Sequence, residues 1–228
     1  MANGKPNLFE FLKRFYATPI SLGMKPILVL DSSAVIDLDQ SYQKKYGLRR
    51  SFLFLDHLQN AAPGLQILVP QLIKTELEYH REWQVGGRPE ISSDTLDKIQ
   101  RLPSYDEPAE LFFSQEQARL DQARYCLRLM YAATAEGKKA VQDPISKEDW
   151  KIIDTAISVG IFAEEMLLRN KLTGQKNILW GTYKTAALTA DAHIYGTITR
   201  VFEEPEGVEL TQFIKPVNVR SYTINEVN

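Results

Sequence analysis

Residues 25–37 read Lys25-Pro26-Ile27-Leu28-Val29-Leu30-Asp31-Ser32-Ser33-Ala34-Val35-Ile36-Asp37, and this stretch decides the fold that we expect. The run 27–30 is apolar and rich in β-forming residues, which is typical of a strand buried on both faces of a parallel sheet. Asp31 follows that strand directly, and open α/β sheets place their sites at the carboxyl ends of strands. Because a helix start follows, Asp31 is either a helix N-cap or a functional carboxylate.

The composition is that of a globular chain without a strongly charged surface. The 228 residues are 44% hydrophobic and carry a net charge of −2, so nucleic-acid binding would need a local patch. One cysteine and three scattered histidines exclude an internal disulfide and a zinc site built on cysteine or paired histidine. With no 18-residue apolar segment and no signal-peptide core, we expect a cytoplasmic protein without a membrane partner.

The pattern of apolar runs divides the chain into four parts. Residues 1–25 form a helical extension, and residues 26–84 alternate strand, helix, strand and helix. This alternation predicts parallel strands joined by a right-handed crossover. Residues 85–145 interrupt it as a helical insertion, whose apolar stripe is either core or a dimer seam. Residues 146–228 return to the α/β pattern and end in a tail, so we expect an α/β fold with a mostly parallel sheet.

The segments around the second strand carry several local predictions. We expect a polar loop over 40–50, a helix over 51–59 capped by Ser51, and a last strand over 208–213 followed by an edge strand over 217–222. The loop holds a group of cations, which are either solvated or in contact with phosphate: Lys44, Lys45, Arg49 and Arg50.

A helix over 71–83 carries a carboxylate among apolar residues. On a helical wheel Leu72, Ile73, Leu77 and Trp83 form the apolar arc, Glu76 and His80 fall inside it, and Lys74 points elsewhere. A lone buried carboxylate costs several kcal/mol unless it is paired or binds a metal. Glu76 is therefore either half of a structural ion pair, a residue at the rim of the buried face, or a ligand.

Two more carboxylates occupy comparable positions. Asp154 lies on the inward side of a helix that begins at a capping box near residue 146, and Asp191 follows a short apolar strand over 186–189. If the strands are adjacent, Asp31, Glu76, Asp154 and Asp191 converge and cannot all stay ionised without a counter-charge. Carboxylates suit Mg²⁺ or Mn²⁺, and such metals promote phosphodiester hydrolysis.

These elements together resemble the PIN domain, a metal-dependent nuclease fold. The four matching motifs are, in chain order, Leu28-Val29-Leu30-Asp31-Ser32-Ser33-Ala34-Val35-Ile36, Ile67-Leu68-Val69-Pro70-Gln71-Leu72-Ile73-Lys74-Thr75-Glu76-Leu77, Ile153-Asp154-Thr155-Ala156-Ile157 and Leu188-Thr189-Ala190-Asp191. The resemblance implies a three-layer α/β/α sandwich with a mostly parallel central sheet. It also implies endonucleolytic cleavage of RNA, usually single-stranded, with Mg²⁺ or Mn²⁺ in an acidic pocket.

The resemblance also assigns roles to individual residues. The four acids Asp31, Glu76, Asp154 and Asp191 would be the metal ligands and catalytic residues. Ser33 and Thr189 match supporting positions. Apart from the resemblance, Lys151 and Lys184 stand near the acidic motifs and are either solvated at the surface or in contact with phosphate. The partner is RNA, and an inhibitor or regulatory protein or a second copy of the chain remains open.

Three other functions compete with the ribonuclease. The first is a non-catalytic PIN-like scaffold that binds RNA or protein, and the second is a structure-specific DNA nuclease of the flap type. The third resembles the haloacid-dehalogenase-type phosphatases, with Asp37 as nucleophile and Asp39 as acid. This third alternative requires a strand through Ser32 and Ser33, against their propensity.

Overall fold

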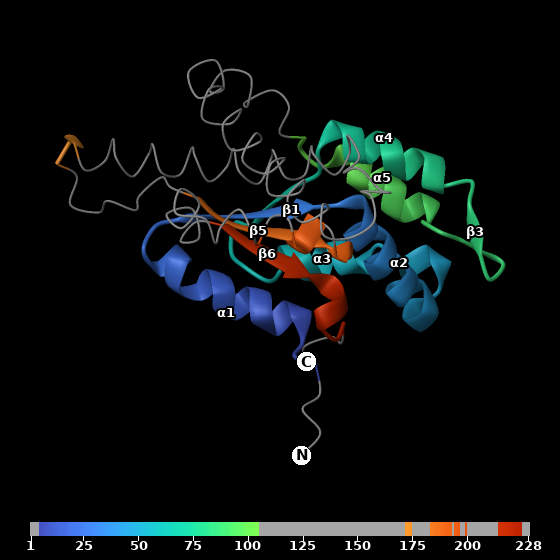
Figure 1. Cartoon of the computed structure of the whole chain (residues 1–228), viewed down its shortest axis with the longest axis horizontal. Helices are drawn as coiled ribbons and strands as arrows, with labels where there is room; N and C mark the ends of the chain where they lie inside the picture. The colour runs from blue at the N-terminus through green and yellow to red at the C-terminus, as the bar shows by residue number, and fades with distance from the viewer. Residues whose placement is uncertain are drawn as a thin grey trace, which may run out of the picture.

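The computed structural model describes residues 5–104, 172–174, 183–192, 194–196, 199 and 214–224. These residues form an α/β fold in which a four-stranded parallel sheet is flanked by helices (Figure 1). The strand order is β2-β1-β5-β6, with bounds β1 Lys25–Leu30, β2 Gln66–Leu68, β5 Tyr183–Thr189 and β6 Ile214–Asn218. The parallel sheet predicted from the sequence is therefore confirmed.

Strand β1 is central in this sheet. It pairs with β2 over Ile27–Val29 and with β5 along its whole length, from Lys25 opposite Tyr183 to Leu30 opposite Leu188. Every residue of β1 after Lys25 is buried, because strands cover both edges and helices cover the sheet. The unbroken apolar run predicted this placement correctly.

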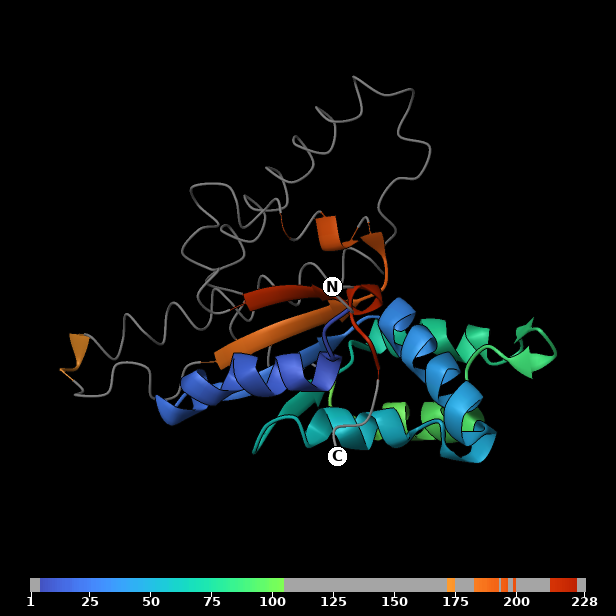
Figure 2. The same cartoon turned by 90° about the horizontal axis from the view of Figure 1, so that it is seen from below.

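Helix α1, Leu8–Ser21, packs its apolar face along β1 (Figure 2). Asn7 caps the helix, since its side-chain oxygen accepts from the amides of Phe9 at 2.9 Å and Glu10 at 3.1 Å. The buried face comprises Leu8, Phe9, Leu12 and Tyr16. The amino-terminal helix expected from the sequence is thus part of the same core as the sheet.

The hydroxyl of Tyr16 bridges two strands of the sheet. It donates to the carbonyl of Ile27 at 2.5 Å and accepts from the amide of Ala186 at 3.1 Å. In the register that places Ile27 opposite Thr185, these two backbone groups face each other across the β1–β5 pair. Burial raises the pKa of the Tyr16 phenol well above its ordinary value, with the Ala186 amide acting weakly in the opposite direction.

Replacing Tyr16 with Phe is expected to lower the free energy of unfolding by about 1–3 kcal/mol at neutral pH, because two buried backbone groups lose their bridge. The folded chain keeps the Tyr16 proton at pH values where the unfolded chain releases it. Its contribution is therefore complete below the ordinary pKa of about 10 and falls by up to about 1.4 kcal/mol per pH unit above it. Urea unfolding between about pH 8 and about pH 11 should show the difference between wild type and variant narrowing. A difference that stays constant over this range would contradict the assignment.

The two ends of the described chain pair with each other beside the sheet. Leu8 donates its amide to the carbonyl of Thr223 at 3.0 Å, and the amide of Thr223 donates to Pro6 at 2.8 Å. The carboxyl-terminal prediction was partly wrong: β6 occupies 214–218, and a 3₁₀ turn, η3 Val219–Ser221, replaces the edge strand expected over 217–222. The strand predicted over 208–213 lies outside the described residues.

Helix α2, Ser32–Tyr46, corrects the loop that we predicted over 40–50. Polar residues in its second half, such as Gln43, turn inward, which conceals the helical pattern from a reading based on hydrophobicity alone. Gly47 ends the helix at φ +81°, a conformation that favours glycine, and a short 3₁₀ turn, η1 Leu48–Arg50, follows.

Asp39 anchors α2 through a buried network of hydrogen bonds. Its fully buried carboxylate accepts from Gln43 Nε2 at 2.6 Å, from the Ser92 amide at 2.9 Å and from the Ser92 hydroxyl at 3.2 Å. Thr95 Oγ1 donates to the same carboxylate at 2.5 Å. Ser51 joins this network by donating to Ser92 Oγ at 2.6 Å. It does not cap helix α3, Leu53–Gln59, so the cap predicted there was wrong.

Helix α4, Gln71–His80, exposes and buries different residues from those that its wheel predicted. Lys74 is buried, because its ammonium donates to the carbonyls of Gln100 at 3.3 Å and Leu102 at 2.5 Å. These carbonyls lie at the carboxyl end of α5, Ser93–Arg101, where a cation is favourable. Leu72 and Trp83 are exposed, so the apolar arc predicted to include them was wrong.

The segment between α4 and α5 is a short antiparallel hairpin. Strands β3, Gln84–Val85, and β4, Arg88–Pro89, are joined by Gly86 and Gly87.

None of the helices in the described part of the chain is long and apolar enough to cross a membrane.

Candidate functional site at the carboxyl edge of the sheet

Asp31 stands at the carboxyl end of the central strand and is 1% exposed. Its amide donates to the carbonyl of Leu188 at 3.0 Å, which continues the β1–β5 pairing to this position. Its backbone occupies the N-cap position of α2, but its side chain makes no capping hydrogen bond. The alternative that the Asp31 carboxylate serves as a helix cap is therefore excluded.

Two hydroxyl groups hold the Asp31 carboxylate instead. Ser33 and Thr189 both donate to Oδ2 of Asp31, the latter at 2.7 Å, and the oxygens of these two donors are 3.2 Å apart. Each hydroxyl in turn accepts a backbone amide, Ser33 from Ala190 at 2.9 Å and Thr189 from Asp191 at 3.0 Å. Because an ionised carboxylate can only accept hydrogen bonds, each hydroxyl donates its single proton to Asp31 while its oxygen accepts the backbone amide.

This arrangement fixes the orientation of a buried carboxylate with groups from two neighbouring strand ends. Proteins orient metal-binding carboxylates in this way, with hydrogen bonds from groups that do not themselves bind the metal. Ser32 adds a longer contact from its hydroxyl to the other oxygen, Oδ1, at 3.4 Å. Ser33 and Thr189, predicted as supporting residues, thus both contact Asp31.

Asp191 lies two residues beyond the end of β5, beside Thr189. Its Oδ1 accepts from the amide of Ile194 at 3.2 Å, and its carbonyl accepts from the amide of Tyr195 at 3.1 Å. Asp191 therefore caps the turn of chain that follows β5, the role that Asp31 does not perform. Its side chain is partly exposed, whereas that of Asp31 is buried.

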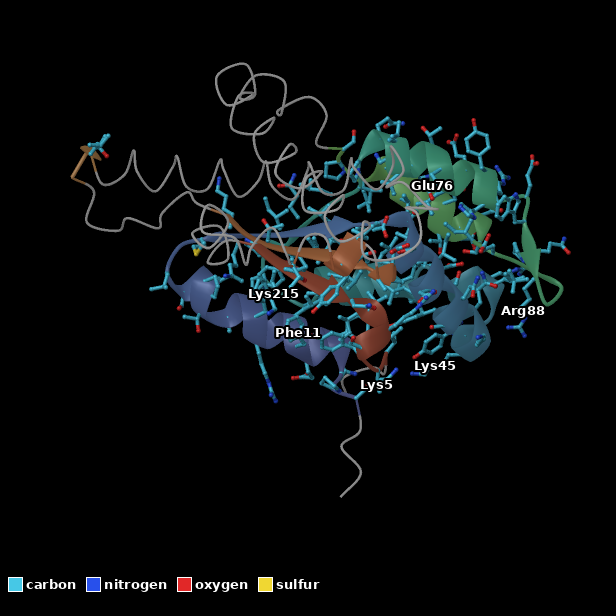
Figure 3. The ribbon with its side chains drawn as sticks, viewed as in Figure 1. Lys5, Phe11, Lys45, Glu76, Arg88 and Lys215 are labelled. Atoms are coloured by element: carbon cyan, nitrogen blue, oxygen red, sulfur yellow. The ribbon has the colours of Figure 1, made fainter. Side chains whose placement is uncertain are left out.

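Glu76 takes a different position, on helix α4, which packs against α2 (Figure 3). Its side chain is 29% exposed, and its Oε1 lies 3.7 Å from Nε2 of His80. The other ring nitrogen of His80, Nδ1, lies 2.8 Å from Oε2 of Glu90. The contact of Glu76 with His80 is therefore an ion pair when the imidazole is protonated, which is one of the roles named for Glu76 from the sequence.

Of the remaining predicted residues, Asp154 and Lys151 lie outside the described residues. Lys184 lies at the amino end of β5, five residues before Thr189, so the structure does not bring it to the acids. Its ammonium lies 5.0 Å from the ring centre of Phe15, and burial, together with the charge of Lys215, lowers the pKa of Lys184. Its position does not support the predicted phosphate contact at the acidic edge.

Arg220 is a cation near this edge that the sequence reading missed. It follows β6 in η3, where its guanidinium donates to both oxygens of Asp37, at 2.6 and 3.0 Å. These hydrogen bonds, followed by the charge of Asp37 and more weakly that of Asp191, raise the pKa of Arg220. No sequence signal connects Arg220 to the acids, because it lies in the carboxyl-terminal tail, far from each acidic motif along the chain.

Two carboxylates of the described residues stand at adjacent strand ends. Asp31 and Asp191 provide carboxylate oxygens at adjacent strand ends, which suits Mg²⁺ or Mn²⁺ in donor type. Within the ranges that the structure describes, no group of three or more His, Cys, Asp and Glu side chains is spaced to hold a metal ion. The predicted set also includes Asp154, which lies outside those ranges.

The phosphatase alternative meets a structural difficulty. It needs a strand leading into Asp37 and Asp39, but both residues lie within helix α2. Asp39 is fully buried in its network and Asp37 binds Arg220 at the surface. Neither carboxylate stands at the end of a strand, where that chemistry requires its nucleophile.

Comparisons with known proteins add no relative to this description: no family model, no curated protein and no solved structure matches the chain.

Proposed function

We propose that this protein is a metal-dependent endoribonuclease of the PIN type, with a three-layer α/β/α sandwich around its parallel sheet. The observation that carries the proposal is the buried carboxylate of Asp31. It does not cap α2, and the hydroxyls of Ser33 and Thr189 both donate to one of its oxygens. A buried charge held in this way, at the carboxyl end of a central parallel strand, supports a role in a site.

The proposed ligands of Mg²⁺ or Mn²⁺ are Asp31 and Asp191, with Glu76 and Asp154 contributing directly or through water. When bound, such a metal would activate water and stabilise the charge that develops as a phosphodiester bond is hydrolysed. Ser33 and Thr189 would keep the Asp31 carboxylate in one orientation, because their own oxygens are fixed by the amides of the turn after β5.

Cleavage of labelled single-stranded RNA, structured RNA and flapped DNA would test this function, each with Mn²⁺, with Mg²⁺ and with EDTA. We expect cutting within single-stranded RNA that requires the metal. Preference for flapped DNA would instead favour the structure-specific DNA nuclease. RNA binding without cutting, under conditions where the metal demonstrably binds, would favour the non-catalytic scaffold.

A further inference from the structure

Five exposed cations gather where helix α2 ends. This cationic surface consists of Lys44, Lys45, Arg49, Arg50 and Arg88. Arg88 comes from the hairpin and joins the others because its Nη1 donates to the carbonyl of Gln43 at 3.4 Å. Figure 3 shows Lys45 and Arg88 at the same end of the molecule. Since the whole chain has a net charge of −2, such a local group of positive charge needs an explanation.

Internal ion pairs do not explain three of the five cations of this surface. No acidic side chain in the described part of the chain pairs with Lys44, Arg49 or Arg50. Other surface lysines do find partners, such as Lys98 with Asp56 at 3.1 Å. Lys44 and Lys45 lie in the last turn of α2 and complement its dipole, but the three arginines lie outside the helix.

An exposed aromatic residue directly precedes the hairpin that carries Arg88. Trp83 is 59% exposed and directly precedes β3, with one edge of its ring against His80 at a centroid distance of 4.8 Å. Val85 is 56% exposed and stands opposite Arg88 in the hairpin, so their side chains share one face. Trp83 lies two residues before Val85, and side chains two residues apart in extended chain point to the same side, so Trp83 shares that face. Cations combined with an accessible aromatic ring are typical of surfaces that bind single-stranded nucleic acid.

The cationic surface is also continuous with the acidic edge along α2. Asp31 precedes the first residue of this 15-residue helix, which spans about 21 Å. One side of α2 carries residues at three- and four-residue spacing. They are Asp37, Ser41, and then Lys44 and Lys45. Arg220 binds Asp37 part of the way along, which adds a cation between the acids and the end of the helix.

We propose that a single-stranded RNA segment outside the cleaved bond lies along this side of α2, with its phosphates on the cationic surface and a base stacked on Trp83. The proposal rests on the ribonuclease function proposed above, but it concerns binding and can be tested without cleavage. Arginine binds phosphate through two parallel hydrogen bonds, which suits Arg49, Arg50 and Arg88 for this role.

The test measures binding of a fluorescently labelled 12-nucleotide single-stranded RNA by anisotropy, in EDTA so that metal-dependent cutting cannot occur. The double variant Arg49→Glu, Arg50→Glu is expected to bind at least about tenfold more weakly at low salt. The slope of log K against log salt should fall by about 1.4, because each phosphate contact on a single strand contributes about 0.7. Trp83→Ala should weaken binding at least about fivefold with an unchanged salt slope.

The matched control is Lys13→Glu, Arg14→Glu, which makes the same charge change on exposed residues of α1. Figures 1 and 2 both place α1 away from the β3–β4 hairpin. Circular dichroism and thermal melting of each variant establish that it is folded. The control should retain most of the affinity, losing only what the change in net charge causes.

Three results would overturn the proposal. The first is that both double variants weaken RNA binding equally. The second is that neither double variant weakens RNA binding. The third is binding of the wild type to phosphatidylserine vesicles, lost in Arg49→Glu, Arg50→Glu, while RNA affinity is unchanged. Failure of the ribonuclease function would look different, since the RNA would still bind through these residues but would not be cut when metal is added.

Discussion

Replacing Asp31 with Asn is expected to abolish metal-dependent RNA cleavage while leaving the melting temperature equal or higher. The amide cannot supply the negative charge that a divalent cation needs, so the loss should exceed the roughly 100-fold that follows removal of a group merely supporting a ligand. The side-chain oxygen of Asn can still accept from Ser33 and Thr189. Removing a buried charge beside Asp191 also relieves repulsion.

Asp56→Asn is the matched control for this experiment. It makes the same change at an acid that is 45% exposed and paired with Lys98. It should leave the cleavage rate unchanged and alter stability by less than about 1 kcal/mol. Cleavage measured under single-turnover conditions, together with thermal melting, separates the two effects. Normal cleavage by Asp31→Asn would remove Asp31 from the site.

The second large effect is expected at Asp39, where Asp39→Ala should reduce the free energy of unfolding by about 3–5 kcal/mol. The substitution removes the acceptor shared by the Ser92 amide, the hydroxyls of Ser92 and Thr95 and the amide of Gln43. These groups would remain buried without an acceptor. Since domains are stable by only about 5–15 kcal/mol, the variant should be close to unfolding at physiological temperature.

Asp37→Ala on the same helix provides the comparison. Asp37 pairs with Arg220, whose side chain is 65% exposed, so its loss should cost no more than about 1 kcal/mol. Urea unfolding of both variants measures the contrast directly. Equal stability of the two would mean that the network around Asp39 contributes little. A phosphatase activity abolished by Asp37→Ala would instead revive the dehalogenase-like alternative.

The sequence predicted the centre of the fold well because its signals there are local. An unbroken apolar run identified β1, and Asp31 directly after it was correctly placed at a carboxyl strand end. Thr189 and Ser33 were both named as supporting groups, and the structure brings both hydroxyls to Asp31. The residues alone did not decide whether the Asp31 carboxylate caps the helix or is held by these hydroxyls. An Asp between a strand and a helix fits both arrangements equally well.

The predictions failed where polar residues are buried by partners distant in sequence. The second half of α2 reads as a loop because Asp39 and Gln43 face the core. Their distant partners are Ser92, which is 53 residues beyond Asp39, and the Pro89 carbonyl, which is 46 residues beyond Gln43. The helical wheel placed Lys74 outside the apolar arc, although Lys74 is buried and its ammonium binds the end of α5. Neither contact has a signature at helical or strand spacing.

The positions of two cations show the limits of proximity along the chain. Lys184 is five residues from Thr189, but a strand carries it to the opposite end of the sheet. Arg220 is 29 residues beyond Asp191 in the numbering, and yet the charge of Asp191 helps to raise the pKa of Arg220, because β6 lies beside β5. Sheet order, which the sequence does not state, decides both cases.

The most direct test of the proposed metal site is a crystal of the protein soaked in Mn²⁺, with data collected at the manganese absorption edge. We expect an anomalous peak within bonding distance of the Asp31 carboxylate, about 2.1 Å as for comparable hard cations, with Ser33 and Thr189 still donating to Asp31. Manganese bound elsewhere in the same crystal, with none at Asp31 at saturating concentration, would contradict the site and with it the proposed nuclease.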